Sequence, residues 1–281
     1  MTDLLLHSST KKALERLQSQ QPHAIALFGP KGAGKRTVAR RLAEELLQTK
    51  LQSGSNYFEV APGDNDAITI DQAREIKQFV KLKISGNTSV KRVVIISDAQ
   101  TLQESAQNTL LKLIEEPPVG TVFILTASAQ ETLLPTLISR LTTIKLMPVS
   151  AQQLSQLPKA KHLDNQELAR IFHLSGGHVG LANRLLSSND VDDSLMKDMQ
   201  IAKQLIASKR YDRLGNIEYL LKNHETAMQV LFCMQKILEY KLHSTHDESV
   251  SEKIRHVISA QDDLNRRVNK KLVFTDLFMK L

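Results

Sequence analysis

The sequence predicts an α/β domain built on a parallel sheet, followed by a part of the chain that is helical throughout. Two observations support this prediction. Up to about residue 145, short apolar runs typical of strands alternate with segments whose apolar residues recur at helical spacing. From Ser150 onward the strand signals disappear and helical patterns continue alone. Continuous apolar strands that alternate with helices are typical of a parallel sheet covered on both faces.

Three strands and three helices carry the α/β prediction. The strands are expected at Ala24–Phe28, Lys91–Ser97 and Thr121–Ser128, which are short and almost entirely apolar. The helices are expected within residues 36–48, 68–80 and 104–116, where apolar side chains follow helical spacing.

Local signals suggest where these helices begin and end. The helix within residues 68–80 follows a short strand or turn and is expected to be capped near Asp71. The helix within 104–116 is expected to end before Pro117 and Pro118, because proline disfavours helical geometry in the residue before it.

The second part of the chain is expected to hold two groups of helices. Small helices are predicted over residues 150–187, with a break at Gly176 and Gly177. Helices are also predicted from about residue 193 to 281, with Ser244–Ser249 as a polar connector.

Composition excludes several classes of protein. The single cysteine, Cys233, rules out an internal disulfide and a multi-cysteine zinc site. No apolar run approaches the roughly 18–20 residues that span a bilayer, and the first residues are not typical of a signal peptide, so a cytoplasmic location is the default. The net charge of +7 indicates either a polyanionic partner or a solvated basic surface. Tryptophan is absent and aromatic residues make up 4% of the chain, so aromatic platforms for stacking the bases of single-stranded nucleic acid are not evident.

The segment Gly29–Thr37, GPKGAGKRT, resembles a phosphate-binding loop with one departure. Its glycines Gly29, Gly32 and Gly34 permit the turn, and Lys35 supplies a positive charge for phosphate. The next position normally carries a hydroxyl that reaches Mg²⁺, but here it is Arg36, and Thr37 comes one residue late.

A second departure follows the strand at 91–97. Hydrolysis needs an acidic group there to hold Mg²⁺ and a carboxylate to orient water, and the usual pair is Asp-Glu. This chain has Ser97 and Asp98 there. If Asp98 takes the second position of the pair, Ser97 replaces the aspartate that holds Mg²⁺, and if Asp98 takes the first, Ala99 replaces the glutamate. One carboxylate is missing in both cases, so the sequence predicts no metal site. Thr126 and Ser128 end the third strand and are candidate sensors of a γ-phosphate. Arg140, after a short helix-like turn, is a candidate for stabilising charge on a transferring phosphoryl group.

The run from Arg92 to Leu141 is similar, without gaps, to the AAA+ module of bacterial clamp-loader subunits. The motifs that match are Asn108–Pro118, NTLLKLIEEPP, and Pro135–Arg140, PTLISR. The loop Gly29–Thr37 and the ending Leu264–Leu281 resemble the stator type of subunit rather than the motor subunits tau and gamma. The resemblance covers nearly the whole chain and is weakest over residues 190–255.

The resemblance implies three domains: an AAA+ RecA-like P-loop domain at 1–148, a helical lid at 149–190 and a helical collar for oligomerisation at 191–281. It places Ser97 at the magnesium aspartate and Asp98 at the catalytic glutamate of the motor subunits. It places Gly180 where motor subunits carry a sensor arginine, and it makes Arg140 an arginine finger that acts on ATP bound by the neighbouring subunit.

Two departures from the family concern other features. Residues 48–66 contain no cysteine, so the four-cysteine zinc module of many members is absent and no zinc is expected. Leu141 replaces the cysteine that usually follows the finger arginine. Both departures bear on how the chain contacts its neighbours.

The expected function is a largely hydrolysis-deficient clamp-loader stator within a DNA polymerase III holoenzyme, a nucleotidyltransferase. Its expected partners are the tau or gamma and delta subunits, and the assembly would load a sliding clamp onto primed DNA. ATP is the expected ligand, bound weakly by this chain or only by its neighbour. Two alternatives stay open: an active ATPase subunit in which Thr37 and Asp98 restore metal binding, and a nucleic-acid-binding scaffold with a vestigial loop.

Overall fold

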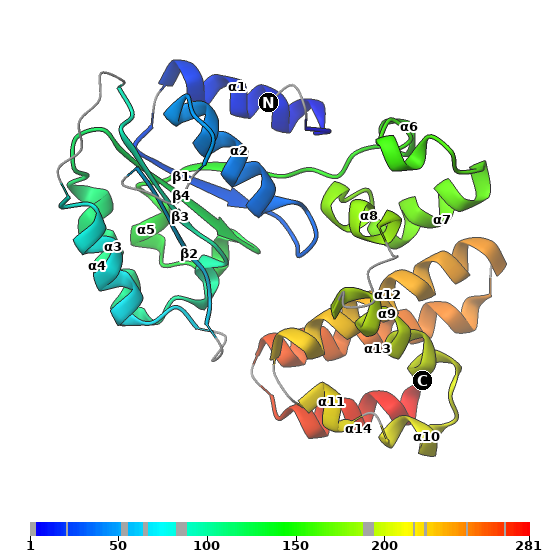
Figure 1. Ribbon diagram of the computed structural model, residues 1–281. Coiled ribbons are helices and arrows are strands. Elements are labelled where there is room, and N and C mark those ends of the chain that lie inside the picture. Colours follow the sequence, from blue (N-terminus) through cyan, green and yellow to red (C-terminus); the bar gives the residue numbers. More distant parts are fainter. Residues whose placement is uncertain are drawn as a thin grey trace. The chain divides into compact units, whose positions relative to one another are not determined.

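The computed structural model describes residues 4–20, 22–51, 56–63, 67–82, 89–187, 194–215, 217–221, 224–245, 247–266 and 268–281. The chain divides into two compact units, shown in Figure 1. The first comprises residues 1–150 together with 178–180, and the second comprises 151–177 together with 181–281. The division into three domains remains a prediction.

The first unit contains a five-stranded sheet in the order β2-β3-β4-β1-β5 (Figure 1). Its strands are β1 (Ala24–Phe28), β2 (Tyr57–Val60), β3 (Arg92–Ile96), β4 (Thr121–Ala127) and β5 (Thr142–Lys145). All neighbouring strands pair in parallel. The predicted parallel sheet and its three central strands are confirmed, whereas β2 and β5 were not predicted.

The two faces of the sheet bury alternate side chains of the three central strands, β1, β3 and β4. Ile25 and Leu27 of β1 pack with α1 (Ser8–Gln20) and α2 (Lys35–Leu47). Ala24, Ala26 and Phe28 face the other core, which α3 (Ile70–Phe79) and α4 (Glu104–Glu115) complete. Because parallel strands are covered on both faces, their apolar runs are continuous, which is why these strands could be recognised in the sequence.

Short helices complete the first unit. They are η1 (Ala99–Thr101), η2 (Gln130–Thr132) and α5 (Pro135–Ile138).

The N-terminal cap of α3 is Thr69, which forms a capping box with Gln72, and Asp71 lies in the first turn of this helix. Helix α4 ends at Glu115, just before Pro117, as predicted.

The second unit is helical over its described residues. It contains α6 (Ala151–Leu154), η3 (Pro158–Ala160), α7 (Asn165–Ser175), α8 (Val179–Leu186), α9 (Ser194–Ala207), α10 (Arg210–Leu214), α11 (Ile217–Leu221), α12 (His224–Thr245), α13 (Glu248–Asn265) and α14 (Lys270–Lys280). Of α8, residues 179–180 group with the first unit. The predicted break at Gly176 and Gly177 is confirmed, because both adopt positive φ between α7 and α8.

One continuous apolar core holds the second unit together. It includes Phe274 and Phe278 of α14, which are almost completely buried, and Val257 of α13. The connector between α12 and α13 is shorter than predicted, since α12 extends to Thr245 and α13 begins at Glu248. Among the helices described, none combines the length and apolar character that a bilayer span requires.

Candidate nucleotide site and arginine finger

The predicted phosphate loop, residues 29–34, leaves β1 and enters α2, the context in which such loops bind phosphate. Gly32 and Gly34 adopt φ values of 85° and 88°, which favour glycine. The loop is tied to the sheet at its start, where Gly29 N–H donates to the carbonyl of Ala127. The sequence therefore places the expected cradle at the N-terminal end of α2.

Lys35 directs its charge into its own loop. Its ammonium group donates to the carbonyl oxygens of Gly29 at 2.7 Å and Pro30 at 3.2 Å. Burial lowers the pKa of Lys35; attraction from Asp98 opposes this shift, and repulsion from Lys31 adds to it. The lysine that a phosphate would bind is thus already hydrogen-bonded.

Arg36 makes an ion pair with Glu59, at the carboxyl end of β2. Its Nε lies 2.5 Å from Glu59 Oε1, and the Glu59 side chain is only 9% exposed. Arg40, one helical turn further along α2, pairs with the other carboxylate oxygen at 2.8 Å. Thr37 lies between these arginines and has an exposed side chain.

Two hydroxyl groups complete the surroundings of Glu59. The Ser97 hydroxyl donates to Oε1 at 3.2 Å, and the Tyr57 hydroxyl donates to Oε2. Burial raises the pKa of Glu59, but hydrogen bonds from Tyr57, Arg40 and Arg36 outweigh it, so the net pKa is lowered. The pKa of Tyr57 is raised by burial and by its bond to this carboxylate. Glu59 therefore stays ionised and is shared by two arginines, so these three side chains keep a net charge of +1.

These residues do not fit the Mg²⁺ ion that phosphate-loop hydrolases use. Mg²⁺ needs near-octahedral oxygen ligands, typically a loop hydroxyl and a carboxylate on the neighbouring strand. In the register expected from the sequence, those two positions carry the guanidinium of Arg36 and the Ser97 hydroxyl, and both groups are bonded to Glu59. The carboxylate in reach is already paired with Arg36 and Arg40. No group of three or more His, Cys, Asp or Glu side chains suited to a metal was found within the described ranges.

Asp98 and the sensor candidates meet at the carboxyl ends of β3 and β4. Asp98 has a φ of 52°, uncommon for a non-glycine residue, and its backbone N–H donates to the hydroxyl of buried Thr126 at 3.0 Å. Gln100 bridges the two strands, because its amide donates to the Asp98 carboxylate and accepts from the Ser128 backbone N–H. Ser128 itself is exposed. Thr126 thus holds the Asp98 turn.

Gly180 lies against the phosphate loop, and both belong to the first unit. A Cβ at Gly180 would lie 2.6 Å from the carbonyl oxygen of Gly32 and 2.9 Å from the Gly34 nitrogen. Neither atom can give way without backbone movement. A side chain at this position, such as an arginine, is therefore incompatible with this conformation of the loop.

Arg140 follows α5 and is held at three points. Its Nη1 donates to the Thr136 carbonyl at 2.8 Å and to the Ser139 hydroxyl at 3.1 Å. Its Nη2 lies 2.8 Å from Glu115 Oε1, at the end of α4. The side chain is 40% exposed. Sequence reasoning identified Arg140 but neither Glu115 nor Glu59 as residues of interest.

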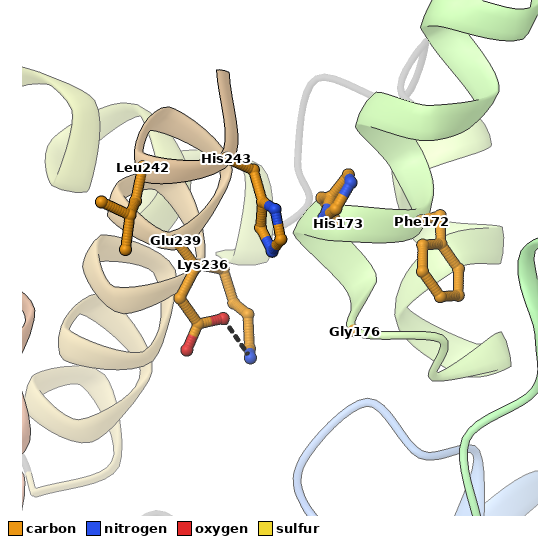
Figure 2. A pocket seen from close by; sticks show the side chains of 7 residues that line it. All are labelled: Phe172, His173, Gly176, Lys236, Glu239, Leu242 and His243. Carbon is orange, nitrogen blue, oxygen red and sulfur yellow. Dashed lines mark hydrogen bonds and ion pairs between the residues drawn. The ribbon is translucent and has the colours of Figure 1, made fainter. Parts of the chain in front are cut away.

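A separate cavity of about 240 Å³ lies in the second unit, between α7 and α12 (Figure 2). His173 and His243 face each other there, with ring centroids 5.0 Å apart. Lys236 pairs with Glu239 at 2.6 Å on the same side of α12. None of the predicted site residues lines this cavity.

The parallel sheet, the glycine-rich loop entering α2 and the following helices define an AAA+ fold. Solved structures support this class. A DNA polymerase III gamma subunit-related protein of Thermotoga maritima is similar with a TM-score of 0.58 and 19% identity, over 96% of this chain and 97% of that one. The RuvB Holliday junction branch migration motor of the same species has a TM-score of 0.50 and 18% identity, over 75% and 80%. At these identities the likeness concerns the fold alone.

The family model described as DNA polymerase III, delta subunit matches residues 7–150, and the chain belongs to this family. The delta-prime subunit of Pseudomonas aeruginosa DNA polymerase III is 31% identical over 188 residues, 60% of this chain and 57% of that protein. The Haemophilus influenzae delta-prime subunit is 26% identical over 60% and 57% of the two chains. Human replication factor C subunit 5 is 25% identical over 68% and 58%. The alignments thus span less than two thirds of the length of these relatives.

Proposed function

We propose that this chain is a delta-prime-like stator of a clamp loader, largely unable to hydrolyse ATP. It would supply Arg140 to the ATP site of a neighbouring motor subunit. The proposal combines the family with the geometry of the loop: the two positions that handle Mg²⁺ in motor subunits are tied to Glu59 by Arg36 and Ser97.

The observation that carries the proposal is the ion pair between Arg36 and Glu59, with the Arg36 Nε 2.5 Å from the carboxylate. It holds a positive charge at the position whose hydroxyl would otherwise reach the metal, and it engages the Glu59 carboxylate. Hydrolysis by loops of this type depends on the metal to neutralise developing charge. ATP bound by this chain would therefore be bound weakly, and productive ATP would be that of the neighbour.

The proposed partners follow from the family. They are the tau or gamma and delta subunits, met through the helical second unit, with the sliding clamp and primed DNA engaged by the whole assembly. The chain would act in the cytoplasm, at the nucleoid during replication, within a DNA polymerase III holoenzyme. It would have no ATPase activity of its own.

The positions of Thr37 and Asp98 disfavour the alternative of an active ATPase. That alternative needs Thr37 and Asp98 to restore metal binding. Thr37 is the residue after Arg36 on α2, about 100° further round the helix, and its side chain is exposed. Asp98 is bonded to Gln100. The stator is accordingly the function that we propose.

The test is a reconstituted ATPase assay with the motor and delta subunits of the same organism, clamp and primed DNA. This chain alone is expected to show no turnover. Arg140→Ala is expected to lower turnover of the assembly tenfold or more, about 1.4 kcal/mol of barrier, because finger arginines act on the transition state.

Arg74→Ala is the matched control, since Arg74 is also an exposed arginine in an ion pair and lies on α3. It should leave turnover unchanged. Turnover by the isolated chain, or full activity of an intact assembly that carries Arg140→Ala, would contradict the proposal.

A further inference from the structure

We propose that Glu115 is a positioning residue for the finger arginine, holding the Arg140 guanidinium in the orientation in which it meets a phosphate of the neighbouring subunit. The inference rests on the function proposed above. It arises from the 2.8 Å ion pair between Arg140 Nη2 and Glu115 Oε1.

The three contacts of Arg140 differ in what they can fix. Thr136 and Ser139 belong to the same short segment as Arg140, so their bonds shape that segment without anchoring it elsewhere. Glu115 comes from α4, whose contacts with α5 bring the two segments together. The ion pair is thus the contact that relates the guanidinium to another part of the first unit.

Helix α4 is a firm support for this carboxylate. Ile114, the residue before Glu115, is fully buried in the core beside the sheet. The helix ends at Glu115, and the prolines at 117 and 118 prevent its continuation. The backbone of Glu115 is therefore held from both sides, by packing before it and by the helix stop after it.

The guanidinium retains donors for a ligand. An arginine has five N–H donors, and Nη1 supplies the two bonds to Thr136 and Ser139. Nε has no acceptor among the residues that the structure describes. With the side chain 40% exposed, this edge of the group can reach a phosphate oxygen while Glu115 keeps its hold on Nη2.

Such a restraint affects rate rather than affinity. A long side chain that is ordered before the reaction loses less entropy when it meets the transition state. Because a finger arginine stabilises charge that develops only there, its misplacement lowers kcat and leaves KM unchanged. An exposed ion pair adds little to stability, so Glu115 variants should fold normally.

The experiment is the assembly ATPase assay with Glu115→Gln, which keeps the shape and removes the charge. Turnover at saturating ATP is expected to fall about three- to tenfold with KM unchanged. Glu116→Gln is the matched control, because Glu116 is the adjacent exposed glutamate and makes no ion pair within the described structure. It should behave as wild type.

A double variant separates positioning from a general structural role. In the Arg140→Ala background, Glu115→Gln is expected to have no further effect, since the group that it orients is gone. A further fall there, or unchanged or raised turnover of Glu115→Gln alone, would overturn the inference. If Arg140→Ala itself has no effect, the proposed function fails instead, so the two failures are distinguishable.

Discussion

Arg36 and Ser97, from the phosphate loop and from the end of β3, bond to the same oxygen of Glu59, at 2.5 and 3.2 Å. The register expected from the family resemblance puts both at positions that handle Mg²⁺ in phosphate-loop hydrolases. Their shared acceptor also pairs with Arg40, so both oxygens of the Glu59 carboxylate are already bonded to cationic or hydroxyl groups. The predictions for the first unit follow from this arrangement and from the loop beside it.

Nucleotide binding by the isolated chain should not depend on Mg²⁺. Since Arg36 and Ser97 are bonded to Glu59, the ion is expected to gain no ligand from these three side chains. The affinity for a fluorescent ATP analogue, measured by anisotropy, is expected to agree within about twofold in Mg²⁺ and in EDTA. The motor subunit of the same organism is the positive control and should lose affinity in EDTA. A tenfold gain with Mg²⁺ in this chain would contradict the arrangement described.

Glu59→Gln should destabilise the first unit at neutral pH. The largely buried carboxylate accepts bonds from Arg36, Arg40 and Tyr57, and its loss leaves donors poorly satisfied, at a cost of about 1–3 kcal/mol. Chemical denaturation at pH 7 measures the effect. Glu104→Gln, at an exposed position in the first turn of α4, is the control and should cost much less.

Protonation of Glu59 is expected to destabilise the folded protein in acid. The folded pKa of Glu59 lies below its ordinary 4.5, because the bonds described outweigh the effect of burial. A lowered carboxyl pKa stabilises the folded state above the unfolded value, and this stability is lost as the pH falls through the folded value. The free energy of unfolding of wild type should therefore fall more steeply below about pH 4.5 than that of Glu59→Gln. Parallel curves for the two proteins would show that Glu59 contributes nothing to the transition.

Gly180→Ala should disturb the phosphate loop. The added Cβ would lie 2.6 Å from the Gly32 carbonyl oxygen, and the backbone must move to relieve the contact. A loss of about 1–3 kcal/mol is expected, as for other overpacked sites, and thermal unfolding measures it. Gly63→Ala is the control, because a Cβ there meets no atom within 4 Å. An unchanged midpoint for Gly180→Ala would show that the loop yields easily.

His173 should make the second unit sensitive to mild acid. Burial lowers its pKa, repulsion from His243 adds to this, and attraction from Glu239 opposes it. A histidine whose folded pKa is lowered stabilises the protein above its unfolded value of about 6.5, and the stability is lost as the pH falls towards the folded value. Thermal unfolding between pH 7.5 and 5.5 should show this loss in wild type and a smaller one in His173→Gln. The neighbouring Tyr240, whose ring lies 5.7 Å from that of His173, is unchanged in both proteins, so the comparison concerns the imidazole of His173.

The sequence predicted the buried strands and the loop because their signals are local. β1, β3 and β4 are continuous apolar runs, and the glycine pattern of the loop fixes its turn. β2 and β5 were not predicted, because they lie at the two edges of the sheet and are only partly buried. Polar residues therefore interrupt their apolar runs, as Glu59 does in β2. The cap at Thr69 could have been found, since Thr69 and Gln72 have capping-box spacing.

The partners of the site residues could not be predicted in this way. That Glu59 meets Arg36 depends on the chain of β2 returning to the sheet beside β3, and strand order is not encoded in any local pattern. Glu115 likewise lies within a motif that matched the family, but its contact with Arg140 depends on how α4 and α5 pack. Contacts of this kind can be identified only from the folded structure.

The bonds of Lys35 to the carbonyls of Gly29 and Pro30 hold the loop together before any ligand arrives. We therefore expect nucleotide to add little order to the loop, so that the first unit keeps one shape whether nucleotide is abundant or scarce. In an assembly whose other members bind and release nucleotide in turn, such a subunit has no cycle of its own. The timing of the proposed machine would then be set entirely by its neighbours, with this chain as the constant part against which they move.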